Sequence, residues 1–227
     1  MNRFAKLLSI LLTAFMCATA AEKKPDSGLA QVEDDPKLPR VLLIGDSISI
    51  GYTPIVRATL KGKANIHHPP ENCSDSGFGV KSLDKWLGDK KWDVIHFNFG
   101  LHDLKYLDEK GKYVSPDKGK QVNPPDAYEK NLRELVTKLK ATGAKLIFCN
   151  TTPVPDASAG RVKDNEVVYN AVAAKVMAEN AIPVDDLHAI VKAKPELQLP
   201  KNVHFTPDGY KALAAEVVSH VEKALQK

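Results

Sequence analysis

A serine directly after a buried strand has the setting of a nucleophile. The apolar run Val41–Ile44 is followed by Gly45, Asp46 and Ser47. A serine at a sharp turn from strand to helix presents its hydroxyl at the edge of the sheet, where free helix amides stabilise developing negative charge. The same three residues also form ordinary turns and helix caps, so the motif by itself does not establish catalysis.

A histidine near the end of the chain supplies a candidate base. His204 precedes a strongly amphipathic segment that runs from Tyr210 to Leu225. In a fold that alternates strands and helices, the loop before the last helix can reach the turn after the first strand. A neutral imidazole there accepts the hydroxyl proton of Ser47 as the oxygen attacks a carbonyl. The alternative is a helix-entry turn with an incidental histidine.

A third polar cluster, Asn98 to Asp103, follows the apolar run Val94–Phe97. Ligands of open α/β sheets bind at the carboxyl ends of the strands, so this cluster is expected to line the same cleft as the serine. Within this cluster, His102 is the candidate catalytic residue because its imidazole can donate or accept a proton. A hydrogen-bonded loop histidine without a catalytic role is the alternative.

The segments that position these residues alternate between strands and helices. Five apolar runs are typical of buried parallel strands: Val41–Ile44, Ala64–His67, Val94–Phe97, Leu146–Cys149 and Ile182–Val184. Helical spacing of apolar residues predicts helices over 128–139, 168–176 and 210–225. This alternation predicts an α/β fold, a five-stranded parallel sheet with helices on both faces. Pro183 favours an edge position for the fifth strand.

Residues 1–20 have the pattern of a secretory signal peptide. Arg3 and Lys6 precede the apolar run Leu7–Met16, and Ala18–Ala20 supplies a small-x-small cleavage site. The apolar run is short for a membrane span. We therefore expect an exported protein, periplasmic or secreted, with no stable membrane insertion after cleavage. The alternative is an uncleaved membrane anchor.

The remaining chain has the composition of one globular domain. The 227 residues are 43% hydrophobic and 26% charged, with a formal net charge of +4. These values exclude a disordered chain, a fibrous repeat and a protein with several membrane spans. The charge is too small and dispersed to indicate a nucleic-acid partner. Residues 21–39 have few large apolar side chains and are interpreted as a flexible tether, which places the folded domain at 40–227.

Cysteines and metal-ligating residues outside these motifs are few. Cys73 and Cys149 either pair in an oxidising compartment or stay free, and free, buried thiols are the simpler interpretation. His67, His68 and Glu71 could suggest a metal site, but adjacent side chains of a strand point to opposite faces. No metal and no cofactor are therefore expected.

Together, the three motifs resemble the SGNH hydrolases, also called GDSL-type esterases, over residues 40–227. The resemblance implies a three-layer α/β/α sandwich of the flavodoxin type. It also implies that Ser47 is the nucleophile and that His204 is the base. The third block of the family, Gly-x-Asn-Asp, corresponds here to the segment from Gly100 to Asp103.

The chain departs from this family pattern at the group that orients the histidine. Family members usually carry an aspartate three residues before the catalytic histidine, but this position is Lys201, and the next residue is Asn202. A backbone carbonyl could hold the ring instead, as could Asp185 or Asp186, which follow the fifth strand. Asp208 lies at a helix start and is more typical of a cap.

A second departure concerns the oxyanion hole. The resemblance places His102 where the family has an asparagine, and a neutral imidazole can donate its single N–H to an oxyanion. We therefore assign the oxyanion hole to the Ser47 amide, the His102 side chain and one amide from the family's second block. For that amide the spacing favours Ser74, with Gly77 as the alternative.

The sequence thus predicts an exported serine esterase that acts on a small-molecule or carbohydrate ester and most plausibly removes O-acetyl groups from carbohydrate. Arg161, Asn165 and Tyr169 follow the fourth strand and are either substrate contacts or ordinary loop and helix-surface residues. The alternative function is a carbohydrate-binding pseudo-enzyme on the same fold, which both departures from the family pattern favour.

Overall fold

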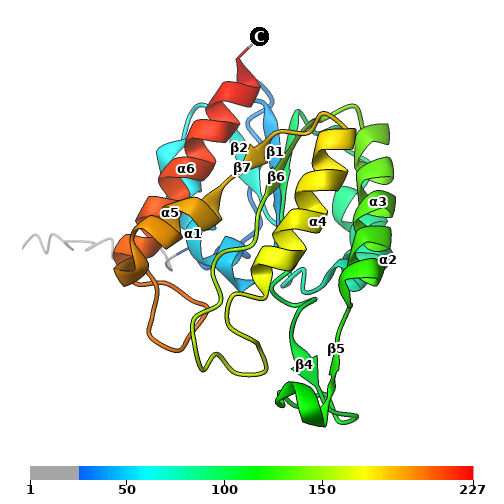
Figure 1. Ribbon diagram of the computed structural model, residues 1–227. Helices are drawn as coiled ribbons and strands as arrows, with labels where there is room; N and C mark the ends of the chain where they lie inside the picture. The colour runs from blue at the N-terminus through cyan, green and yellow to red at the C-terminus, as the bar shows by residue number, and fades with distance from the viewer. Residues whose placement is uncertain (1–25, 227) are drawn as a thin grey trace, which may run out of the picture.

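A five-stranded parallel sheet forms the centre of the computed structural model, which describes residues 26–226 (Figure 1). The predicted signal peptide over 1–20 lies outside the described residues. In spatial order β2-β1-β3-β6-β7, the strands are Asn65–His67, Arg40–Ile44, Val94–Phe97, Lys145–Cys149 and Val184–Asp185. All four neighbouring pairs are parallel. The predicted sheet is confirmed, and β7 is at an edge as Pro183 indicates.

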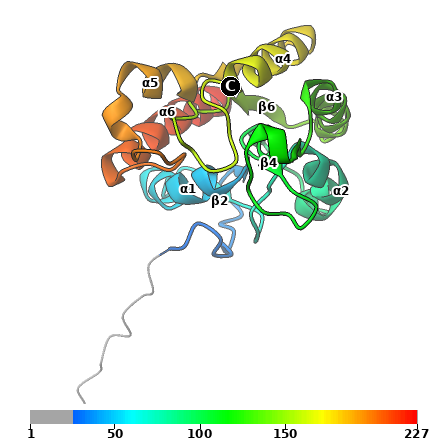
Figure 2. The same ribbon diagram turned by 60° about the horizontal axis from the view of Figure 1, so that its bottom comes forward.

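Helices cover both faces of the sheet, which confirms the predicted three-layer sandwich (Figure 2). One layer contains α1 (Ser47–Thr59), α5 (Leu187–Ala193) and α6 (Pro207–Leu225). The other contains α2 (Ser76–Leu87), α3 (Pro125–Ala141) and α4 (Glu166–Glu179). Helices α1 and α6 pack directly against each other. Their starts are the two places where the sequence motifs put the serine and the histidine.

The central strands are mainly apolar because helices cover both of their faces, and the buried His96 of β3 is paired with Asp185 at 2.8 Å. In β1 the four residues from Val41 to Ile44 are at most 2% exposed, and all four residues of β3 are buried. A strand with two covered faces cannot alternate apolar and polar residues. The polar residues are therefore concentrated in the turns that follow the strands, and this brings the chemistry to one edge of the sheet.

Side-chain caps start the helices that begin at this edge. Asp46 accepts a hydrogen bond from the Ile48 amide at 2.9 Å and begins α1. Thr206 accepts from the Gly209 amide at 3.0 Å and begins α6. Each cap satisfies an amide that the helix itself leaves free. Ser47 is consequently the first residue of α1, beside amides that have no intrahelical acceptor.

The chain from Leu104 to Pro125 contains a small antiparallel hairpin that the sequence did not indicate. Its strands are β4 (Tyr106–Leu107) and β5 (Lys120–Gln121), with a short 3₁₀ helix at Pro116–Lys118 between them. The hairpin projects at the bottom of Figure 1, beyond the ends of the central strands. It thus extends the edge of the sheet where the site residues lie.

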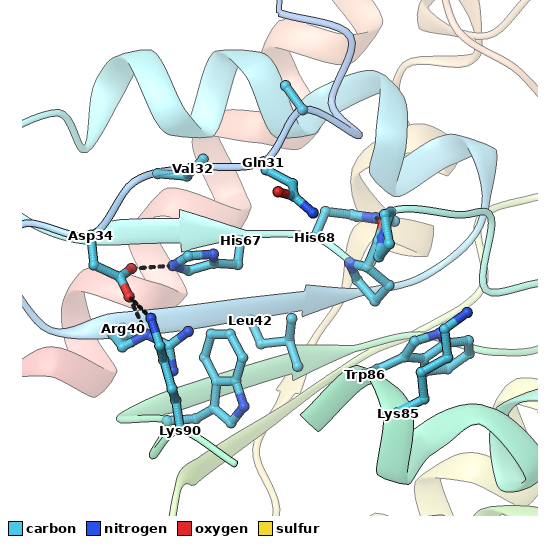
Figure 3. A pocket seen from close by; sticks show the side chains of 14 residues that line it. Gln31, Val32, Asp34, Arg40, Leu42, His67, His68, Lys85, Trp86 and Lys90 are labelled. Atoms are coloured by element: carbon cyan, nitrogen blue, oxygen red, sulfur yellow. Dashed lines mark hydrogen bonds and ion pairs between the residues drawn. The ribbon is translucent and has the colours of Figure 1, made fainter. Parts of the chain in front are cut away.

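Residues 26–39, part of the predicted tether, pack against the domain: Asp26 and Ala30 bind Arg57 of α1, and the segment around Asp34 lies beside edge strand β2 (Figure 3). Asp34 is the centre of their contacts, with its carboxylate 3.0 Å from Arg40 Nε, 2.6 Å from His67 Nε2 and 3.2 Å from Lys90 Nζ. Together with β1, β2 and α2 this segment encloses a cavity of about 300 Å³. The contacts cover an edge that would otherwise expose unpaired backbone groups.

Both cysteines of the described chain are free and buried. Burial raises the pKa of the Cys73 thiol and of the Cys149 thiol, so both stay protonated at neutral pH. Of the predicted alternatives, the free, buried thiols are the ones observed. Among residues 26–226 no helix combines the length and the apolar character needed to cross a bilayer.

Candidate active site

Ser47 and His204 meet at the edge of the sheet, although 157 positions separate them in the chain. Ser47 Oγ lies 2.8 Å from His204 Nε2, within hydrogen-bonding distance. The pair is possible because α1 and α6 pack side by side and both begin at this edge. The arrangement is that of a serine nucleophile with a base in contact with its hydroxyl.

Asn202 orients the histidine ring. Its Oδ1 accepts from the backbone amide of His204 at 3.0 Å and from His204 Nδ1 at 2.8 Å. An amide oxygen only accepts, so the ring proton is on Nδ1 and the lone pair of Nε2 faces the hydroxyl of Ser47. Asn202, two positions before the histidine, thus holds the ring in place. The sequence had instead suggested a backbone carbonyl, Asp185 or Asp186 for this role.

The two aspartates considered for this role have other partners. Asp185 is fully buried, 2.8 Å from His96 Nε2 and 3.5 Å from His220 Nδ1. Asp186 caps α5 by accepting from the Ala189 amide at 3.0 Å. Neither carboxylate contacts His204. The position of these two aspartates after the fifth strand therefore did not identify the group that orients His204. That group is Asn202, which reaches the ring through a local turn.

His102 lies in the same cavity as the Ser47–His204 pair. Its Nδ1 accepts from the Lys105 ammonium at 3.0 Å, so the proton of the neutral ring is on Nε2. Burial, aided by the positive charges of Lys105 and Arg161, lowers the pKa of His102 against the opposing effect of Asp46. The ring is therefore a neutral donor at neutral pH, with its N–H on the nitrogen that faces away from Lys105.

Ser74 and Gly77 are less directly placed for the oxyanion hole. The Ser74 amide donates to Asn72 Oδ1 at 2.9 Å, and Ser74 itself has a left-handed φ of 55°. Gly77 lies beside Asp75 and Asn123. Neither residue lines the cavity, whereas Asn72 does. With its oxygen turned toward Ser74, the Asn72 amide nitrogen is a donor that the sequence analysis did not assign.

The backbone amide of Ser47 completes the set of donors. Within the part of the chain that the structure describes, no acceptor binds this amide, because Asp46 caps the Ile48 amide instead. An unpaired amide at a helix start attracts negative charge. It lies on the residue that would carry the attacking oxygen.

The cavity around this pair has a volume of about 430 Å³ and is open to solvent. Its lining includes Ser47, Asn72, His102, Tyr113, Arg161 and His204. Of the three suggested substrate contacts, only Arg161 lines it. Asn165 precedes α4, and Tyr169 is buried with its hydroxyl donating to the Asn123 carbonyl at 2.7 Å.

A second serine–histidine pair lies two residues along α1. Ser49 Oγ is 2.7 Å from His68 Nε2, and His68 Nδ1 is 2.7 Å from the Pro69 carbonyl. The chemistry of the two pairs is alike, but Ser49 and His68 are buried and neither lines the cavity of Ser47. Access to substrate therefore distinguishes Ser47 from Ser49, and Ser49 offers an internal control.

Changing Asn202 tests its positioning role. Asn202→Ala removes one hydrogen bond to His204 Nδ1, and we expect kcat for p-nitrophenyl acetate to fall about tenfold. Asn202→Asp keeps both hydrogen bonds and adds a charge that stabilises the imidazolium formed during attack, so its kcat should equal or exceed that of the unchanged protein. Steady-state kinetics of both variants check this. An alanine variant with unchanged kcat would assign the orientation to another group.

Comparison with known families finds a match over most of the domain. A sequence model of the GDSL-like lipase/acylhydrolase family matches residues 43–212, more than half of the chain. The match begins in β1 and ends in α6, so it includes Ser47, His102 and His204. A comparison with curated protein sequences gives no match.

Solved structures share the fold at low sequence identity. A lipase/acylhydrolase from Enterococcus faecalis has a TM-score of 0.67 at 21% identity, covering 83% of this chain and 97% of that chain. An acetyl xylan esterase has a TM-score of 0.66 at 19% identity, covering 80% and 99%. An acetylxylan esterase from Geobacillus stearothermophilus has a TM-score of 0.64 at 17% identity, covering 81% and 94%. At these identities the likeness establishes the fold.

Proposed function

The chain belongs to the GDSL-like lipase/acylhydrolase family, and from that premise we propose that it is an exported serine esterase that removes O-acetyl groups from carbohydrate. The observation that carries the proposal is the 2.8 Å contact between Ser47 Oγ and His204 Nε2 in an open cavity. Export rests on the signal-peptide pattern of residues 1–20. Family membership supports ester hydrolysis, and the geometry supports this pair as its centre.

Acyl transfer to the serine is the first step. Ser47 Oγ attacks the ester carbonyl while His204 Nε2 takes the hydroxyl proton, and Asn202 Oδ1 holds the ring throughout. The protonated ring then gives its proton to the leaving alcohol. Water attacks the acyl-serine with His204 again as the base, which releases the acid and restores the serine. These steps need no cofactor.

In this mechanism we assign three donors to the oxyanion, all on residues that line the cavity. They are the Ser47 amide, the Nε2–H of His102 and the side-chain amide of Asn72. Preorganised donors stabilise the tetrahedral intermediate because they need no reorientation as its charge develops. Ser74, the sequence-based choice, acts here through Asn72, since its amide holds Asn72 Oδ1 at 2.9 Å and so directs the nitrogen.

A short acyl group on a sugar fits the cavity best. Most of the residues that line it have polar side chains, with asparagine, histidine, serine and arginine around Ser47. Polar donors and acceptors suit the hydroxyl groups of a sugar, whereas long acyl chains are bound by extended apolar surface. Two solved proteins with the same fold are acetyl xylan esterases, so acetylated xylan is the first substrate to test.

Release of acetate from acetylated xylan oligosaccharides tests this function. We expect acetate to be released, and p-nitrophenyl acetate to be hydrolysed with at least about tenfold higher kcat/KM than p-nitrophenyl decanoate, because the polar cavity offers no apolar groove to the longer chain. Chromatographic quantification of acetate and absorbance of p-nitrophenol give the two readouts. Preference for decanoate would replace the carbohydrate substrate by a lipid.

The alternative is a carbohydrate-binding protein without turnover. It is favoured by Lys201, which stands where the family usually has an aspartate, and by His102, an imidazole in place of an asparagine. Hydrolysis of any ester that is lost in Ser47→Ala excludes this alternative. Tight binding of deacetylated oligosaccharide without hydrolysis of any ester would support it.

A further inference from the structure

The catalytic cavity is lined by two cationic side chains and by no acidic one. Arg161 and Lys201 both contribute to its wall. Asp46, next to the serine, is buried outside this lining: its Oδ1 caps α1, and its Oδ2 lies 3.9 Å from His102 Nε2. Arg161 and Lys201 therefore present positive charge to a substrate that enters the cavity, and an anionic group of the substrate would be attracted to them.

Arg161 differs from the other arginines that the structure describes. Arg40, Arg57 and Arg133 each pair with a carboxylate, at distances of 3.0, 2.7 and 2.6 Å. Among residues 26–226, no ion pair involves Arg161. The chain thus neutralises each described arginine except the one in the catalytic cavity.

Two backbone carbonyls hold the Arg161 side chain in a defined position. Its Nε donates to the Leu101 carbonyl at 3.0 Å, and one Nη donates to the Ala159 carbonyl at 3.2 Å. Burial lowers the pKa of Arg161, although an arginine stays charged at neutral pH. Among residues 26–226 no carboxylate lies within ion-pair distance of this half-buried cation, and Asp46 acts on its charge only at longer range, so an anionic ligand in the cavity would be its first direct partner.

The β4–β5 hairpin region adds to this positive wall. The ring of Tyr113, which is 50% exposed, lies 5.7 Å from the Arg161 guanidinium carbon and 5.5 Å from Lys105 Nζ. An aromatic ring between two cations keeps both at the mouth of the cavity. The hairpin forms a sheet of its own, separate from the central one, and the Tyr106 amide ties it to the loop of Arg161 by donating to the Gly160 carbonyl at 2.7 Å.

We propose that Arg161 selects esters that carry a carboxylate close to the scissile bond, such as an O-acetylated uronic acid. The inference rests on the proposed esterase function and deepens it by naming the substrate class. The guanidinium is a planar donor that matches a carboxylate in two-point contact. The carboxylate belongs either to the sugar that leaves or to the acyl group, and the two arms of the test separate these cases.

Two matched pairs of esters test the selection. The first compares the O-acetylated methyl glucuronoside with the O-acetylated methyl glucoside, which differ only in the carboxylate of the alcohol part. The second compares the p-nitrophenyl monoester of succinic acid with p-nitrophenyl butyrate, which differ in the acyl part. We expect the unchanged protein to prefer the anionic member of one pair by at least about tenfold in kcat/KM, the value of one charge-assisted hydrogen bond.

Substitution of Arg161 then assigns the preference. Arg161→Gln should abolish the preference, mainly through a higher KM for the anionic ester, and Arg161→Lys should keep part of it. The matched control is Lys163→Gln, which removes one positive charge from the same loop at an exposed position outside the catalytic cavity. The control should retain the preference of the unchanged protein.

Two results would overturn the proposal. The first is the absence of any preference in both pairs while the neutral esters are hydrolysed. The second is an equal loss of kcat on neutral and anionic esters in Arg161→Gln, which would place Arg161 at the oxyanion instead. If no ester is hydrolysed, the proposed function fails, and calorimetric binding of methyl glucuronoside against methyl glucoside decides whether Arg161 recognises the carboxylate.

Discussion

Ser47→Ala is expected to lower kcat for p-nitrophenyl acetate by roughly 10⁴-fold or more. The hydroxyl of Ser47 is the oxygen that attacks the carbonyl and carries the acyl group, so its loss removes the covalent route altogether. Any residual rate would come from the oxyanion donors and from His204 acting on water. Steady-state hydrolysis and the yield of covalent label from a serine-directed fluorophosphonate both measure the effect.

Ser49→Ala is the matched control for this variant. It also removes a serine hydroxyl from α1, two residues after Ser47. That hydroxyl contacts His68, as the hydroxyl of Ser47 contacts His204. Ser49 lies outside the catalytic cavity, so the variant should retain both hydrolysis and labelling. Full activity in Ser47→Ala together with loss in Ser49→Ala would transfer the nucleophile to the buried pair and refute the site described above.

His102→Ala should lower kcat by roughly 10²- to 10³-fold, the usual cost of one oxyanion donor. The effect belongs to kcat rather than KM because the donor acts on charge that exists only in the tetrahedral intermediate. His102→Asn, which restores the residue usual in the family, should recover much of the loss because its amide also donates one N–H toward the same region. Kinetics on p-nitrophenyl acetate compare the three proteins.

Lys105 favours the ring tautomer of His102 that this role requires. Its ammonium donates to His102 Nδ1 at 3.0 Å and so keeps the ring proton on Nε2. If His102 were only a structural loop residue, His102→Ala would change thermal stability but leave kcat of the folded protein intact. Such a result would leave the oxyanion hole to the Ser47 amide and Asn72.

Much of the fold follows from the local sequence. The runs Val41–Ile44, Val94–Phe97 and Leu146–Cys149 are continuous and apolar because their strands are covered on both faces, and a parallel sheet is the arrangement in which this occurs. Once the strands are known, Ser47 and His102 are expected at the same edge, since each belongs to the segment that follows a parallel strand. The β4–β5 hairpin was not predicted because two-residue strands have no detectable periodicity.

The partners of the site residues depend on tertiary structure. Sequence spacing placed Ser47 and His204 on suitable elements, but only the packing of α1 against α6 gives the 2.8 Å contact between their side chains. Whether Ser47 or Ser49 is accessible depends on burial, which the shared serine–histidine chemistry does not reveal. The role of Asn202 depends on a turn that directs its oxygen to the ring.

The pairing of arginines with carboxylates also depends on the tertiary structure. The sequence alone contains Arg40, Arg57, Arg133 and Arg161 as equivalent cations, with acids available to each. Three of them find carboxylates because the fold brings Asp34, Asp26 and Glu129 within reach, and Arg161 does not. The sequence by itself determined the parallel sheet, the presence of α3, α4 and α6, and the kinds of reactive group. Tertiary structure decided which groups are buried, paired or open to a ligand, because those properties depend on residues distant in the chain.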